Sequence, residues 1–389
     1  MPWPFAQKLS EVLAPQASVE SSSASTRFAF RLFQKLNGAG NVNVFFSPAS
    51  VMLCVAMVRE LASGETRDAM TKTLEFAELS EAEAALALAA VKAAFRQRPE
   101  LTIMAANSLW CGKDAHVRAE VAAKLRDGYE AELTTVDFAG DAVQRINAWV
   151  NGKTNGLIDR ILDKVSPLAV LVAVNAIYFK GAWITPFKRF LTTDEDFTTA
   201  AGSKKKLPLM RQAGSYRYCE DKFLQAVALP YRGDASMYVM LPSEGTGQKF
   251  VSGLTSGLWD SWVARLELMP GTIRLPRFTL DYSAHMETVL KELGMERAFD
   301  PERAEFDGIQ TDRPPVWIDQ VVHRAVGEVN EEGTEAAAAT AVVMRPLSAL
   351  RPQPKPRTFE RIVNRPFLIV IRDENTGTIL FVGWIGDPQ

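Results

Sequence analysis

The most informative stretch of this chain is Glu331-Glu-Gly-Thr-Glu-Ala-Ala-Ala-Ala-Thr-Ala-Val-Val-Met-Arg-Pro-Leu-Ser348. Its alanine run has helical propensity, yet it follows a segment typical of a strand, 318–329, and precedes a loop rich in proline and arginine. Gly333 provides a backbone hinge between the two. Beyond it, one side-chain parity holds only small residues and one valine: Thr334, Ala336, Ala338, Thr340 and Val342.

That composition suits a strand that has to enter the middle of an existing sheet. Small side chains fit between neighbours already in place, and no charge on the inner parity has to leave water. From this stretch alone, the alternative is an alanine-rich surface helix or linker. The rest of the chain decides between the two interpretations.

Composition indicates an ordinary globular protein. The chain has 389 residues, of which 47% are hydrophobic and 23% charged, which is enough for a large core. A net charge of −2 gives no electrostatic reason for a nucleic-acid partner, and no apolar run has the length of a membrane span. The N-terminus, residues 1–8, lacks the apolar core of a signal peptide. The given sequence therefore indicates a cytoplasmic protein, unless a signal lies outside it.

The cysteines and histidines indicate no catalytic or metal site. The cysteines are odd in number and widely spaced, and we expect buried free thiols: Cys54, Cys111 and Cys219. None of the histidines lies beside a Gly-x-Ser-x-Gly motif or a metal-spaced partner: His116, His285 and His323. We therefore expect neither an enzyme nor a metal or other cofactor.

The run from Leu168 to Trp183 is the strongest strand signal in the chain. Its continuous apolar character predicts burial on both faces of a sheet. Asn175 is the one strong polar group within it and must find a partner. His323 is a candidate, because it shares a strand parity with Ala325. We interpret His323 as structural, since a lone histidine on an apolar face is usually a satisfied core residue.

Domain organisation follows from local composition. Residues 1–25 end in a serine-rich run and are predicted to form a flexible arm, whereas no linker interrupts 26–389, which we expect to be one domain. Ser25 or Thr26 is expected to cap the first helix. Residues 205–218 have the pattern of a β-hairpin.

Several motifs, in order along the chain, resemble the serpin family of serine protease inhibitors. The Glu-Glu-Gly-Thr-Glu-Ala-Ala-Ala run is similar to the hinge of the serpin reactive-centre loop, and residues 364–388 are similar to the serpin C-terminal signature. The resemblance covers about residues 26–388. It implies an α+β fold with three β-sheets, about eight or nine helices, and an exposed reactive-centre loop at about 331–361.

The resemblance also implies structural roles in the centre of the main sheet, called the shutter, and at its top, called the breach. Six residues match these two regions: Ser47, Ser50, Asn175, His323, Trp183 and Arg277. Arg277 is implied to pair with Glu331 at the start of the loop. A plain helix N-cap explains Ser47 or Ser50 equally well, and both interpretations are compatible.

As a serpin, the chain is expected to be a suicide-type inhibitor. The protease cuts the loop, which then inserts as a new central strand through the hinge residues: Glu331, Gly333, Thr334, Ala336, Ala338 and Thr340. The 14 steps from Gly333 to Leu347 span about 46 Å at roughly 3.3 Å per residue, against a diameter of roughly 50–55 Å. The alternative is a non-inhibitory serpin, a carrier, chaperone or storage protein, but such members tend to have bulky, charged or proline residues in the hinge.

The reactive bond is predicted between Leu347 and Ser348, by the hinge-to-bond distance typical of the family. Leu347 fits an apolar primary pocket, so the expected partner is a chymotrypsin-like serine protease. Arg345 is a rival, but Pro346 follows it and hinders trypsin-like enzymes, while cleavage after Met344 falls three residues short. We expect a monomer that can form polymers when the loop of one molecule adds to the sheet of another. The family resemblance, unlike the N-terminal sequence, implies an extracellular location.

Overall fold

The computed structural model describes residues 23–38, 40, 42–312, 315–333 and 357–389. Its helices are α2 (Ala24–Gly38), α3 (Pro48–Arg59), α4 (Gly64–Thr73), α5 (Glu81–Ala94), α6 (Ala119–Tyr129), α7 (Ala142–Lys153), α8 (Gly247–Gly253), α9 (Ser256–Arg265) and α10 (Glu287–Leu290), with short segments η2 (Arg189–Leu191), η3 (Lys291–Met295) and η4 (Glu296–Phe299). Its strands are β1 (Asn43–Phe46), β2 (Leu101–Gly112), β3 (Ala115–Val117), β4 (Glu132–Val136), β5 (Leu171–Gly181), β6 (Thr193–Thr198), β7 (Lys204–Glu220), β8 (Leu224–Tyr231), β9 (Ala235–Pro242), β10 (Glu267–Pro276), β11 (Phe278–His285), β12 (Ile309–Thr311), β13 (Ile318–Val329), β14 (Phe359–Ile362), β15 (Phe367–Asp373) and β16 (Ile379–Ile385).

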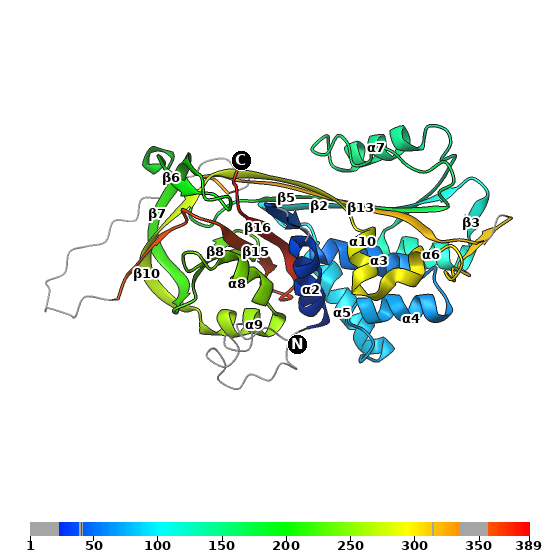
Figure 1. Ribbon diagram of the computed structural model, residues 1–389, viewed down its shortest axis with the longest axis horizontal. Coiled ribbons are helices and arrows are strands. Elements are labelled where there is room, and N and C mark those ends of the chain that lie inside the picture. The colour runs from blue at the N-terminus through cyan, green and yellow to red at the C-terminus, as the bar shows by residue number, and fades with distance from the viewer. Residues whose placement is uncertain (1–22, 39, 41, 313–314, 334–356) are drawn as a thin grey trace, which may run out of the picture.

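A five-stranded sheet with the order β11-β13-β5-β2-β4 runs along the molecule. Helix α7 lies on one side of it, and α3, α4, α5 and α6 lie on the other (Figure 1). Its central strand β5 is buried at all but one position, because both faces are covered, as the apolar run predicts. The predicted start at Leu168 is three residues early, since Leu168 is 80% exposed.

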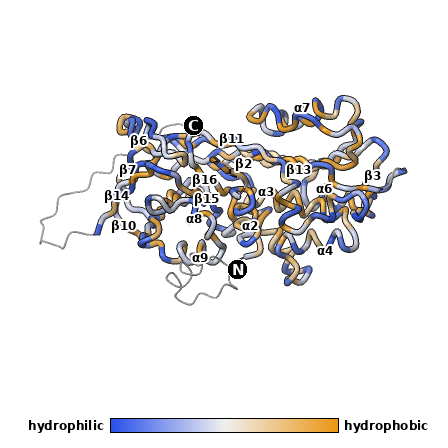
Figure 2. Tube along the Cα trace, in the orientation of Figure 1, coloured by the Kyte–Doolittle hydropathy of each residue, from blue (hydrophilic) through white to orange (hydrophobic). Residues whose placement is uncertain are grey.

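Helix α7 covers the sheet with one face. Ala142, Ile146 and Val150 are buried against Val172 and Val174 of β5 in one hydrophobic cluster. Figure 2 shows hydrophobic and hydrophilic positions interleaved along α7, the pattern of a helix with one side in water. This face of the sheet is therefore covered by α7 and by the segment that follows it, whose Ile158, Ile161 and Leu162 belong to the same cluster.

A nine-stranded sheet packs at one end of β5, with β6 pairing β7 beside the path β1-β16-β15-β9-β8-β7-β10-β14. The predicted hairpin at 205–218 is wrong, because β7 is one continuous strand paired with β10 through Gly214 and Gly271. The Ala-Gly-Ser sequence imitates a turn. In the structure Gly214 leaves room for the Tyr216 ring, which a Cβ at 214 would approach to 3.1 Å.

The first helix begins earlier than predicted. Helix α2 starts at Ala24, and Ser23 Oγ accepts a hydrogen bond from the Thr26 backbone N–H at 3.2 Å. Ser23, rather than Ser25 or Thr26, therefore caps it. The predicted boundary between a flexible arm and the domain at 25/26 lies inside this helix, and residues 1–22 lie outside the described part.

The predicted fold class is confirmed: the described residues form an α+β structure with three sheets and nine α-helices. The three cysteines are free and buried, as expected. Burial raises the pKa of the Cys54 and Cys111 thiols to about 12, so neither is a thiolate nucleophile at neutral pH.

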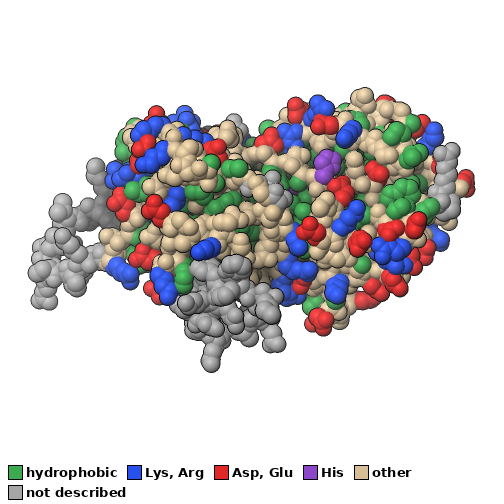
Figure 3. Space-filling view, viewed as in Figure 1, with side chains coloured by type: hydrophobic (Ala, Val, Ile, Leu, Met, Phe, Trp, Pro, Cys, Tyr) green, Lys and Arg blue, Asp and Glu red, His purple; other side chains and the backbone are tan. Residues whose placement is uncertain are grey.

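The surface shows no dominant charge. Figure 3 shows positive and negative side chains mixed over the face in view. Of the helices in the described part of the chain, none has the length and apolarity needed to span a membrane.

Candidate functional site

The candidate site is the junction of β5 and β13, the parallel neighbours at the centre of the five-stranded sheet. We call this junction the seam. Its lower end pairs Ile318 with Leu171, and its upper end pairs Gly327 with Phe179. The hinge stretch begins just past the upper end, because β13 ends at Val329.

A row of polar side chains crosses the sheet halfway along the seam. Asn107 of β2 is opposite Asn175 of β5, which is opposite His323 of β13. The Asn175 amide Nδ2 donates to Ser50 Oγ at 2.6 Å and to Asn107 Oδ1, and its Oδ1 contacts His323 Nδ1. The partnership of Asn175 and His323 expected from strand parity is therefore present.

The protonation state of His323 follows from its other neighbour. The Ser47 backbone N–H points at His323 Nε2 at 3.2 Å. Because an amide N–H only donates, Nε2 accepts, and the imidazole proton lies on Nδ1, where it donates to Asn175. Burial lowers the pKa of His323 from 6.5 to about 3, so the ring is neutral.

Ser47 makes contacts of both kinds, and its shutter role remains a prediction. Its side chain caps α3 by accepting from the Ser50 N–H at 3.1 Å, while its backbone binds His323. Ser50 differs, because its hydroxyl binds Asn175 rather than a helix terminus. Asn107 is a member of this network that sequence reasoning missed, since only the register between β2 and β5 brings it opposite Asn175.

At the upper end of the seam, Trp183 is buried and stacks on Tyr231 with ring centroids 4.1 Å apart. Its indole Nε1–H donates to the Asn330 carbonyl at 3.0 Å, and its backbone N–H donates to the Glu332 carbonyl at 3.1 Å. The breach therefore joins the end of β5 to the start of the hinge mainly through the main chain.

Gly333 reverses the chain at this point. Its N–H and C=O bond to the C=O and N–H of Asn330 at 3.2 and 2.9 Å, and it forms an antiparallel bridge with Ala182. Its φ is +117°, and a Cβ would lie 2.2 Å from the Gly181 carbonyl oxygen. Only glycine satisfies both the dihedral angle and the close approach.

Glu331 is buried and its contacts differ in strength. Thr192 Oγ1 donates to its carboxylate at 2.8 Å, and the Phe187 N–H donates to its carbonyl at 2.7 Å. Arg277, the partner implied by the family resemblance, lies 3.8 Å from the carboxylate and is half-exposed. The pair is present, but Thr192, which sequence reasoning missed, makes the closer contact.

The predicted loop limits of 331–361 are too wide. Glu331 is held in the breach, and β14, which contains residue 361, pairs in parallel with β10. The proposed hinge and reactive-bond residues beyond Gly333 lie outside the described residues, as does the proline-rich segment 352–356: Thr334, Ala336, Ala338, Thr340, Leu347 and Ser348.

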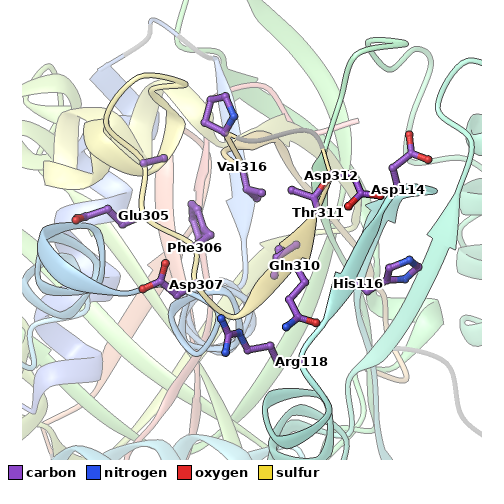
Figure 4. A pocket seen from close by; sticks show the side chains of 13 residues that line it. Asp114, His116, Arg118, Glu305, Phe306, Asp307, Gln310, Thr311, Asp312 and Val316 are labelled. Carbon is purple, nitrogen blue, oxygen red and sulfur yellow. The ribbon is translucent and has the colours of Figure 1, made fainter.

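A hollow lies elsewhere, beside the paired strands β3 and β12. It measures about 690 Å³ and contains none of the predicted site residues. Figure 4 shows its acidic side chains Asp114, Glu305, Asp307 and Asp312 spread around the wall rather than converging on one point. Among the residues that the structure describes, no cluster of three or more ligand side chains is arranged to hold a metal.

The sheet order and the contacts at the seam are features that can be compared with those of known proteins. The family model described as Serpin (serine protease inhibitor) matches residues 23–388. The chain belongs to the serpin family.

Particular relatives are similar along nearly the whole chain. Human leukocyte elastase inhibitor is 35% identical over 386 residues, covering 94% of this chain and 99% of that protein. The native-state crystal structure of tengpin, a thermophilic serpin, has a TM-score of 0.84 at 27% identity, covering 94% of this chain and 93% of that one. The structure of human thyroxine-binding globulin has a TM-score of 0.84 at 25% identity, and the match covers 99% of this chain and 100% of that one.

Proposed function

We propose that this protein inhibits a serine protease by inserting its cut loop into the seam. The observation that carries the proposal is the geometry of Gly333, which forms antiparallel bridges with Ala182 beyond the upper end of β5 and with Asn330 beyond β13. Gly333, which would be the first residue of a strand inserted between β5 and β13, is therefore already paired with residues that follow each of these strands. A strand that continued downwards would be antiparallel to both neighbours and could pair with each.

The length of the hinge fits the seam. From Phe179 to Leu171 the seam has eight steps, about 26 Å at roughly 3.3 Å per residue. Residues 334–347 number fourteen, so they fill it with residues to spare. Insertion replaces the one parallel pairing of β5 with β13 by two antiparallel pairings with the new strand. The additional backbone hydrogen bonds favour the inserted state.

Insertion must also part the shutter. The hydrogen bond between His323 and Asn175 crosses the seam, and a new strand between β5 and β13 separates these side chains. The shutter therefore opposes insertion. Insertion proceeds when the free energy gained from the new strand pairing exceeds the free energy lost with this buried hydrogen bond.

The target class follows from the proposed bond. Leu347 would enter an apolar primary pocket. In a trypsin-like protease the pocket holds a buried carboxylate, which Leu347 would leave without a partner, so binding there is disfavoured. A serine protease target is supported by the 35% identity to a protein named leukocyte elastase inhibitor. The proposed partner is thus a chymotrypsin-like protease, met by a monomeric inhibitor.

The test is incubation with chymotrypsin and trypsin, followed by denaturing electrophoresis and N-terminal sequencing of the released peptide. We expect a covalent complex with chymotrypsin and a peptide that begins Ser-Ala-Leu-Arg. Leu347→Arg should transfer inhibition to trypsin while the complex persists. A peptide beginning at Arg345 or Ala349 contradicts the bond, and cleaved chain without any complex contradicts the inhibitor.

The second candidate is a non-inhibitory carrier, favoured by the likeness to thyroxine-binding globulin over the full chain. The hinge composition favours the inhibitor, since residues 334–341 contain only Thr, Glu and Ala. Thr334→Arg separates the two, because an inserted arginine would be buried without a partner. In an inhibitor the variant becomes a substrate that is cut and not trapped, whereas a carrier is cut without trapping in either form.

A further inference from the structure

The segment between β5 and β6 exposes an unusual amount of apolar side chain. Ile184, Phe190 and Leu191 are 54%, 79% and 36% exposed. They are three of the eight large hydrophobic residues exposed among the described residues, and they lie within eight positions of one another. We call these three side chains the ridge. Large apolar groups that are exposed within one short segment are candidates for contact with another molecule.

The segment that carries the ridge is anchored to the fold between Ile184 and Phe190. Phe187, between its members, is buried, and its N–H donates to the Glu331 carbonyl at 2.7 Å. Gln212 Nε2 donates to the carbonyls of Thr185 and Pro186 at 2.6 and 2.9 Å. Such anchoring lowers the entropy lost when a partner binds.

A hollow of about 180 Å³ adjoins the ridge. Ile184 belongs to both, the apolar groups of Trp183, Leu229 and Pro230 line the hollow, and Gly214 lies at its exposed rim. The hollow has room for one apolar side chain of a partner. The ridge and the hollow together form a surface that is complementary to a protruding apolar side chain of another protein.

Two basic side chains lie beside the ridge, and one of them is paired with an acidic side chain. Lys188 Nζ lies 5.8 Å from the Phe190 ring centroid. Arg189 is 77% exposed and donates to Glu332 at 2.9 Å. Because Arg189 is paired with Glu332, Lys188 is the positive charge that an acidic side chain of a partner would meet beside the ridge.

The ridge also lies at the base of the reactive loop. The contacts of Phe187 with Glu331 and of Arg189 with Glu332 join it to the residues directly before Gly333. A protease bound at Leu347 is tethered 14 residues from Gly333, at most about 46 Å away. A protease of 200–250 residues is itself roughly 45 Å across, so its surface can reach the ridge while its active site holds the loop.

We propose that the ridge, the hollow and Lys188 form a second contact site for the target protease, outside its active site. The site binds an apolar side chain bordered by acidic residues on the protease surface. This inference rests on the proposed inhibitory function and adds to it. Its role is to speed the encounter, so it acts on the rate of inhibition and not on loop insertion.

The test compares Phe190→Glu with a matched control, Leu168→Glu. Leu168 is equally exposed, at 80%, but precedes the lower end of β5, the end remote from the loop base. The second-order rate of inhibition and the stoichiometry are measured with a panel of chymotrypsin-like proteases, using the one that the wild type inhibits fastest. Phe190→Glu should lower the rate at least about ten-fold, while Leu168→Glu changes it less than about two-fold and neither alters the stoichiometry.

A charge variant adds a second readout. Lys188→Glu should slow inhibition at low salt, and its difference from the wild type should shrink as salt screens the interaction. Rates of Phe190→Glu equal to the wild type, or equal slowing by Leu168→Glu, would overturn the second site. A raised stoichiometry for Phe190→Glu would also overturn it, because the residue would then act on insertion. If the wild type forms no covalent complex at all, the proposed function itself fails and this inference falls with it.

Discussion

The shutter and the breach join the same two strands by different kinds of contact. At the shutter, buried side chains of Asn175 and His323 meet across β5 and β13. At the breach, main-chain groups of Trp183, Glu332 and Gly333 make most of the contacts, while the Arg277 side chain remains half-exposed. The shutter thus depends on which side chains are present, whereas the breach depends on the shape of the backbone. Substitutions in the two regions should therefore act differently.

The largest effect is expected for Asn175→Ala. It leaves the His323 Nδ1–H without its acceptor and Ser50 and Asn107 without their donor, all at a buried site. The free energy of unfolding should fall by about 3 kcal/mol, measured by urea denaturation. Asn107→Ala is the matched control, because the Asn107 side chain is partly exposed, and should cost only about 1 kcal/mol. Equal losses would mean that the network is not centred on Asn175.

The second prediction concerns pH at the shutter. Burial lowers the folded-state pKa of His323 to about 3 from 6.5, so between these values the unfolded chain binds a proton that the folded chain does not. This contribution to stability is complete above pH 6.5 and is lost as the pH falls, by about 1.4 kcal/mol per pH unit, or about 2 kcal/mol at pH 5.

The measurement is urea denaturation between pH 7 and 5 for the wild type and His323→Gln. Other groups titrate equally in both proteins, so the difference in slope isolates the imidazole. Parallel profiles would contradict a neutral, buried His323.

At the breach, Gly333→Ala should cost about 1–2 kcal/mol. Its Cβ would lie 2.2 Å from the Gly181 carbonyl, so the bridge to Ala182 must open. We expect faster hydrogen exchange of the Trp183 backbone amide, because its N–H donates to the Glu332 carbonyl next to Gly333. Gly202→Ala is the control, because Gly202 also has a positive φ, +82°, but open space around its missing Cβ. Similar exchange at Trp183 in both variants would mean that the close approach is unimportant.

The smallest effect is expected for Arg277→Ala. Its charge is half-exposed and 3.8 Å from Glu331, so its loss should change the free energy of unfolding by less than about 0.5 kcal/mol and vanish at high salt. Thr192→Val, which removes the 2.8 Å hydrogen bond to the same buried carboxylate, should cost about 1 kcal/mol. The reverse order would make the ion pair the stronger support of the breach.

Sequence patterns predicted the parts of the site that depend on local composition. The apolar run around Asn175 predicted a doubly covered strand, and the isolated polarity of Asn175 required a partner that strand parity found in His323. Gly333 was predicted as a hinge because a glycine separated two dissimilar segments. Each inference needed only neighbours along the chain.

The residues that were missed depend on pairing between distant segments. Asn107 joins the shutter through the register of β2 with β5, and Thr192 reaches Glu331 across 139 positions. The hairpin predicted at 205–218 failed for the same reason, since β10 keeps Gly214 in an extended strand. Local patterns carry no signal of such partners.

The close packing at Gly333 has a consequence for the gene. Every glycine codon has guanine at its first two positions, and each amino acid reached from it by one base change carries a Cβ. Position 333 therefore has no missense neighbour that avoids the Gly181 carbonyl. In a library of single-base variants selected for the proposed inhibition, residue 333 should remain glycine and its codon should vary only at the third base, while the codons of the exposed ridge residues should accept more changes.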